Sequence, residues 1–241
     1  MIMPHHSFLA CFASFLVLIS SIEAQTSPTP ILGHELGESF TRHHSMVDYV
    51  QHMAKVMPHW KLQEYGRTTE DRPLLGLIMS SPDNMSQLDE LKADNMRRVS
   101  DGMDRGERVA WVYLSYNVHG NEAVCTEAAM ATIEALATTH AQLLNRTVVV
   151  IDPCVNPDGR DRYVHFQDHS SASRPNTDPQ AWEHDEPWPG GRSNHYLFDM
   201  NRDLAWQTQR ETQARTAFYR SWHPQVHVDF HEQGVNSPYY F

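Results

Sequence analysis

A histidine and a glutamate three residues apart give the first indication of chemistry in this 241-residue sequence. His119 and Glu122 lie in the stretch NVHGNE, residues 117–122, directly after an apolar run. At this spacing a single turn of chain brings an imidazole and a carboxylate to one point, where they can occupy two corners of a zinc site. The pair alone also fits a simpler role, in which Glu122 stabilises the unpaired N–H groups at a helix start. A metal site therefore requires a third ligand elsewhere in the chain.

His231 is the candidate for that third ligand. It directly follows the last predicted strand, the run QVHVDF at residues 225–230. If this run and residues 109–116 form neighbouring strands, its imidazole can reach the first pair. Two histidines and one glutamate leave a fourth position for water, which is the arrangement of a catalytic rather than a structural zinc. Glu232 points to the opposite face of a strand from His231, so we do not assign it the role of general base.

Two arginines and an amide precede the last predicted helix. Arg192 is followed by the stretch DMNR, which contains Asp199, Asn201 and Arg202. A bidentate arginine is a natural receptor for a substrate carboxylate, and a second arginine near a metal can stabilise the oxyanion formed at an attacked carbonyl. For any single arginine a surface ion pair is the more common role. By itself NPDG, residues 156–159, indicates only a turn.

The elements that must position these residues alternate between strand and helix patterns. Residues 109–116 are apolar on both alternating faces, as a strand buried between two layers requires. Residues 147–152 are predicted to be a second buried strand, and residues 225–230 a third core strand. A helical pattern at 123–138 between the first two predicts a right-handed βαβ unit. The predicted class is α/β, with three layers and a mixed, mainly parallel central sheet. Further predicted elements are helices at 45–57, 85–99 and 204–222 and an antiparallel hairpin of residues 61–66 and 74–79.

The N-terminal sequence predicts where the protein is located. Residues 1–24 are predicted to be a secretory signal peptide, because the apolar run 8–19 is short and Ala24 offers a cleavage point. An uncleaved anchor remains the alternative, since residues 1–6 contain no lysine or arginine. Residues 25–42 read as an N-terminal arm. We expect a secreted or periplasmic protein with no stable membrane span after cleavage, in which pairing of Cys125 with Cys154 stays open.

The acidic charge argues against nucleic acid as a partner. The chain carries 19 basic and 30 acidic side chains, a formal charge of −11, and no basic run of the kind that binds phosphates.

The polar stretch 159–197 follows a buried strand. We expect it to be a long loop that borders a site, because α/β folds place ligands at the carboxyl ends of their strands.

The chain contains, in this order, the motifs HGNE, NPDG and DMNR and a strand-terminal histidine. Together they resemble the zinc carboxypeptidase family (carboxypeptidase A-like metallopeptidases) over roughly residues 49–233. Residues 43–241 would then be the N-terminal portion of a metallocarboxypeptidase catalytic domain. The resemblance implies one Zn²⁺ and a peptide or protein C-terminus as substrate. It implies the following roles: His119, Glu122 and His231 as metal ligands, Asn201 and Arg202 as the grip on the substrate's terminal carboxylate, Asp199 as the partner of a ligand histidine, and Arg192 as the group that polarises the carbonyl. Arg160 and Arg162 compete for that last role.

One departure from the family concerns the general base. The family uses a glutamate on a strand well beyond the third ligand, whereas residues 233–241 contain no glutamate. We therefore expect these 241 residues to be a truncated and inactive piece of a longer enzyme. Two alternatives stay open: a non-catalytic carboxylate-binding pseudo-peptidase, and a hydrolase of the same fold that acts on acylated amino acids or cell-wall peptides.

Overall fold

The computed structural model describes residues 25–102, 109–172 and 176–234. The predicted signal peptide, residues 1–24, lies outside the described residues. Within them, no helix has both the length and the apolar character needed to cross a bilayer.

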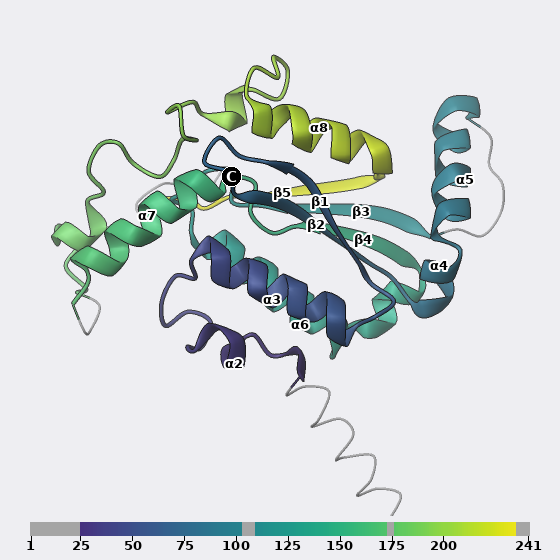
Figure 1. The fold of residues 1–241 in the computed structure, drawn as a ribbon, viewed down its shortest axis with the longest axis horizontal. Coiled ribbons are helices and arrows are strands. Elements are labelled where there is room, and N and C mark those ends of the chain that lie inside the picture. The colour runs from purple at the N-terminus through teal and green to yellow at the C-terminus, as the bar shows by residue number, and fades with distance from the viewer. Residues whose placement is uncertain (1–24, 103–108, 173–175, 235–241) are drawn as a thin grey trace, which may run out of the picture.

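A mixed five-stranded sheet forms the centre of the molecule, in the order β1-β2-β4-β3-β5 (Figure 1). β1 pairs antiparallel with β2, and β2 pairs antiparallel with β4. β4 and β3 are parallel, as are β3 and β5. Four of the five strands therefore point the same way, and β2 runs against them. The strands are β1 (Lys61–Arg67), β2 (Pro73–Met79), β3 (Ala110–Tyr116), β4 (Thr147–Asp152) and β5 (Val226–Phe230).

Helices cover both faces of the sheet and complete the three predicted layers (Figure 1). One face packs against α3 (His43–Val56) and α6 (Val124–Ala137), and the other against α8 (Arg210–Trp222). The other helices in the described part of the chain are α2 (Thr29–Leu32), α4 (Pro82–Ser86), α5 (Leu88–Asp101) and α7 (Pro157–Ser170), with short 3₁₀ turns η1 (Ala141–Asn145), η2 (Trp182–His184) and η3 (Met200–Arg202).

The alternation of strand side chains divides the core between the two faces. In β4, Val149 and Ile151 pack toward α3 and α6, whereas Val148 and Val150 pack toward α8. Burial of each such side chain stabilises the fold by roughly 1.5–3 kcal/mol. Both faces of the strand are therefore apolar, which is the pattern that the sequence showed.

The stretch 159–197 and the helix predicted at 204–222 differ from the structure. Residues 159–197 are not one long loop, because α7 occupies their first part. Asn156 caps this helix by accepting a hydrogen bond from the main-chain N–H of Gly159, and Pro157 fills the first turn. The predicted helix 204–222 begins only at Arg210, because the carboxylate of Asp203 accepts from the N–H groups of Thr208 and Gln209 and holds this stretch as a loop.

Parallel pairing of β3 with β5 sets the position of the candidate ligands. Tyr116 and Phe230, the last residues of the two strands, are register partners. Both chains therefore leave the sheet at the same edge, one toward His119 and the other toward His231.

Close packing of α8 on the sheet gives a test of this architecture. A Cβ atom on Gly76 of β2 would lie 2.3 Å from Cζ of Phe218 in α8. Replacing Gly76 with alanine should lower the free energy of unfolding by about 1–3 kcal/mol, because the ring or the helix must shift. Urea denaturation measures the effect, and in a Phe218→Leu background the same substitution should cost less. Equal losses in both backgrounds would contradict the packing described.

Candidate metal centre

The loop that follows β3 carries two of the three candidate ligands. His119 is buried, with only 3% of the residue exposed. The main-chain N–H of Glu122 donates to the carbonyl of His119 at 3.1 Å, and that of Cys125 donates to the carbonyl of Glu122 at 3.2 Å. These turns lead directly into α6. His119 and Glu122 are thus held on a short connection between two buried elements.

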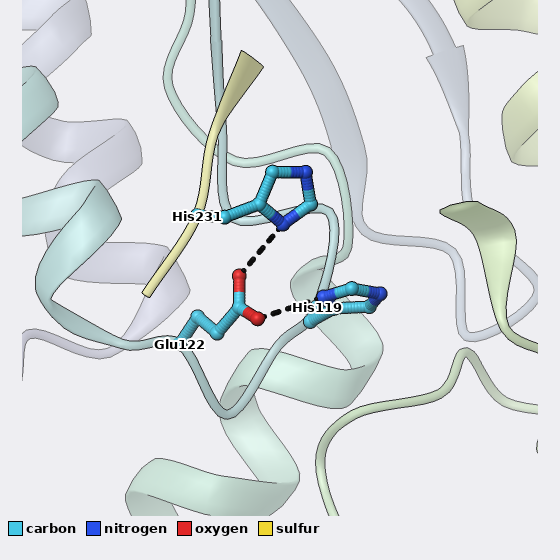
Figure 2. Close-up of side chains that lie close together, drawn as sticks. All are labelled: His119, Glu122 and His231. Atoms are coloured by element: carbon cyan, nitrogen blue, oxygen red, sulfur yellow. Dashed lines mark hydrogen bonds and ion pairs between the residues drawn. The ribbon is translucent and has the colours of Figure 1, made fainter. Parts of the chain in front are cut away.

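The three predicted ligands converge on one point (Figure 2). The carboxylate of Glu122 lies between the two imidazoles, with Oε1 2.8 Å from Nδ1 of His119 and Oε2 3.0 Å from Nδ1 of His231. The two rings are 5.0 Å apart between centroids. One ligand atom from each residue can be chosen so that all three lie within 4.8 Å of one another. This separation suits three donors around a single small cation.

Each imidazole turns one nitrogen to the shared carboxylate and the other to an aspartate. Nε2 of His119 lies 3.1 Å from Oδ1 of Asp199, and Nε2 of His231 lies 3.4 Å from Oδ2 of Asp229. Carboxylates in this position fix the tautomer and ring orientation of zinc-binding histidines. The donor set of two nitrogens and one carboxylate therefore fits Zn²⁺, and it leaves one tetrahedral position for water.

The charges of the site keep its carboxylates ionised. Burial would raise the pKa of Glu122, but hydrogen bonds from His119 and His231 outweigh it and hold the pKa at about 2. Contacts with Asp229 and Glu122 raise the pKa of His231 to about 9. For Asp199, burial is outweighed by the charges of His119 and Arg192, so its pKa is lowered. The site is electronegative and favours a cation.

Arg192 joins this arrangement through Asp199. Its Nε and Nη2 atoms donate to Oδ2 of Asp199 at 3.3 and 3.1 Å, while the side chain remains 48% exposed. The aspartate thus connects the guanidinium to a candidate metal ligand. Arg160 is fully buried, and Arg162 donates to the carbonyl of Gly190 at 2.9 Å. Of the three arginines considered from the sequence, Arg192 is the one placed beside the metal centre.

Asn201 and Arg202 lie in η3, immediately after Asp199. The N–H of Asn201 donates to Oδ1 of Asp199 at 3.0 Å, which joins η3 to the carboxylate that contacts His119. Arg202 is exposed and donates to the carbonyl of Asn201 at 3.2 Å. Its guanidinium is therefore open to solvent at the end of a turn fixed to the site.

Two carboxylates near the metal centre, those of Asp229 and Glu232, have no role predicted from the sequence. Asp229 lies two residues before His231, so both point to the same side of the chain; this spacing was the signal that could have revealed it. Glu232 accepts from the N–H of Val124 at 2.6 Å. It therefore stabilises the start of α6, the role that Glu122 could have had.

Comparison with known proteins defines the family. The zinc carboxypeptidase family model matches residues 46–239, and the chain belongs to this family. Human carboxypeptidase D is 29% identical over 161 residues, which cover 61% of this chain and 10% of that protein.

Solved structures share the fold at low sequence identity. Thrombin activatable fibrinolysis inhibitor matches with a TM-score of 0.57 and 14% identity over 90% of this chain and 54% of that one. A metallo-carboxypeptidase from Burkholderia cenocepacia matches with a TM-score of 0.52 and 18% identity, over 81% of this chain and 42% of that one. Carboxypeptidase A from Helicoverpa armigera matches with a TM-score of 0.51 and 14% identity, over 82% of this chain and 47% of that one. The chain thus spans about half of these structures and a tenth of carboxypeptidase D.

Replacement of the orienting aspartate tests the geometry of the site. In Asp199→Asn the negative charge beside His119 is lost, and zinc affinity should fall about 10–100-fold. Chelator competition measures the affinity. Asp168→Asn is a suitable control, because Asp168 pairs with Arg42 at 2.6 Å rather than with a histidine. An unchanged affinity in Asp199→Asn would contradict the orienting role.

Proposed function

We propose that this protein is part of a zinc-dependent metallocarboxypeptidase that removes the C-terminal residue of peptides. The observation that carries the proposal is the convergence of His119, Glu122 and His231 at the ends of two adjacent parallel strands. Membership in the zinc carboxypeptidase family gives independent support.

The ligand set defines the chemistry. When bound, zinc supplies a Lewis acid that lowers the pKa of its water and polarises the carbonyl of the substrate. His119, Glu122 and His231 would hold the ion, while Asp199 and Asp229 orient the two imidazoles. The remaining polar side chains would then act on the substrate.

Three of those side chains would bind different parts of the substrate. Arg192, half exposed beside Asp199, would donate hydrogen bonds to the oxyanion that forms at the attacked carbonyl. Asn201 and the solvent-open guanidinium of Arg202 would bind the substrate's terminal carboxylate. A clamp on that carboxylate restricts cleavage to the last peptide bond, so the activity is exo-acting.

We further propose that a polypeptide of these 241 residues alone has negligible turnover. The reaction needs a base to take the proton of the attacking water. Glu232 contacts the start of α6 instead, and residues 233–241 contain no glutamate. A non-catalytic carboxylate-binding protein, or a hydrolase of acylated amino acids or cell-wall peptides, would share the same metal centre.

The proposed location rests on the N-terminal sequence. The apolar run 8–19 and Ala24 support export through a cleaved signal peptide to a secreted or periplasmic location.

Two substitutions separate metal binding from substrate binding. They are made in the full polypeptide encoded by the reading frame that contains these residues, and assayed on blocked dipeptides. His119→Ala should lose both zinc and hydrolysis. Arg202→Ala should keep zinc and show a raised KM, because only the clamp on the terminal carboxylate is lost.

Arg42→Ala serves as the control, since Arg42 forms an exposed ion pair with Asp168. It should leave zinc content and KM unchanged. Equal behaviour of His119→Ala and Arg202→Ala would contradict the assignment. Zinc binding without hydrolysis of any C-terminal residue would favour the non-catalytic alternative.

A further inference from the structure

Asn117 lies where β3 ends and the ligand loop begins. Its backbone φ is 62°, in the left-handed region that asparagine tolerates better than most residues. Its side chain is buried from solvent. A buried carboxamide in this conformation needs hydrogen-bond partners, and their identity shows what the residue contributes.

The amide nitrogen of Asn117 contacts carbonyls throughout the ligand loop. Nδ2 lies 2.7 Å from the carbonyl oxygen of His119, 2.9 Å from that of Glu122 and 3.3 Å from that of Gly120. Two of these carbonyls belong to candidate metal ligands. One side chain therefore fixes the main chain at both ligands of the loop.

The amide oxygen of Asn117 is held from the other side. It accepts from Oγ1 of Thr126 and from Nη1 of Arg160, each at 3.2 Å. The guanidinium of Arg160 can only donate, so the oxygen must face it and the nitrogen must face the loop. If the carboxamide turned over, its oxygen would face the three carbonyls of the loop and its nitrogen would face the guanidinium of Arg160.

Arg160 is itself fixed within the core. Its Nη2 donates to Oε1 of Glu127 at 2.6 Å, and its Nη1 donates to the carbonyl of Ala123 at 2.7 Å. The guanidinium is fully buried, and it also donates to the carbonyl of Thr41. Removing one partner of such a pair leaves an uncompensated buried charge. The ion pair thus anchors the end of the ligand loop at Ala123 as well as the amide of Asn117.

Main-chain packing leaves the loop little room to move. A Cβ atom on Gly120 would lie 2.2 Å from the main-chain nitrogen of Arg160 and 2.5 Å from the carbonyl oxygen of Gly191. The ligand loop therefore rests directly on the first turn of α7. This contact explains the glycine between the two ligands.

We propose that Asn117 is a positioning residue of the metal centre, and that the buried pair of Arg160 and Glu127 holds it in place. Asn117 sets the main-chain path that presents His119 and Glu122 to the ion, without contacting the ion itself. The inference rests on the proposed function, because it requires that these residues bind zinc.

The test compares zinc affinity with fold stability in the 241-residue chain. Asn117→Asp keeps the size and the acceptor but replaces the donor with a second carboxylate oxygen facing three carbonyls. Its zinc affinity, measured by chelator competition, should fall about 10–100-fold. The visible absorption spectrum of the Co²⁺-substituted protein should change as well, because it reports ligand geometry.

Asn95→Asp is the matched control. Asn95 is also buried, and its Nδ2 donates to the carbonyls of Trp222 and His223, each at 3.0 Å. Its Oδ1 accepts from Gln225. Asn95→Asp should lower the Tm of the metal-free protein but leave zinc affinity within about twofold of the unsubstituted chain.

Asn117→Gly guards against a failure to fold, because glycine adopts the positive φ without strain. It should also weaken zinc binding and alter the Co²⁺ spectrum. Arg160→Lys keeps the positive charge beside Glu127 but loses the forked donors of the guanidinium. It should weaken zinc binding by a smaller factor than the Asn117 variants.

The outcomes distinguish this inference from the proposed function. Unchanged zinc affinity and an unchanged Co²⁺ spectrum in both Asn117 variants would overturn the positioning role alone. A loss of affinity in Asn95→Asp equal to that in Asn117→Asp would also overturn it, because the effect would then follow stability. Failure of the unsubstituted chain to bind zinc would overturn the proposed function and this inference together.

Discussion

Parallel, in-register pairing of β3 with β5 is the constraint on which the candidate metal centre depends. The two strands are far apart in sequence, yet Tyr116 and Phe230 end them side by side, and their rings stack with centroids 4.2 Å apart. A shift of one residue in either strand would turn its side chains to the opposite face. His231 would then leave the carboxylate of Glu122. The register of the core thus decides whether the three ligands meet.

Charge balance explains why a cation suits this edge of the sheet. Three carboxylates, those of Glu122, Asp199 and Asp229, surround two imidazoles. Arg192 and Arg215 compensate two of them, at 3.1 Å from Asp199 and Asp229 respectively. Without a metal, protonation of His231 supplies further positive charge, which agrees with its raised pKa. A divalent ion would supply that charge directly and bind all three ligands.

The sequence was informative where a pattern repeats and less so where single contacts decide. Buried strands such as residues 147–152 were predictable because apolar side chains on both faces fit only a strand between two layers. The family motifs pointed to the residues that meet at the site. In contrast, α7 was missed because its mostly polar sequence resembles a loop, although Asn156 and Pro157 form a capping signal.

Long-range contacts explain most of what could not be predicted. Arg160 was a candidate for the carbonyl-polarising role, but its guanidinium is enclosed by Glu127 and the carbonyls of Thr41 and Ala123. Glu127 lies 33 residues away in sequence. Nothing in the local sequence identifies such a partner, so only the fold separates a structural arginine from one that faces substrate.

A crystal structure of the zinc-loaded chain, with anomalous diffraction at the zinc edge, tests the central claim most directly. We predict a single strong anomalous peak that marks one zinc ion. The ion should be bound by Nδ1 of His119, Nδ1 of His231 and the carboxylate of Glu122, with zinc–nitrogen distances of about 2.0–2.1 Å. A zinc ion bound elsewhere, or one that leaves any of these three residues uncoordinated, would contradict the account.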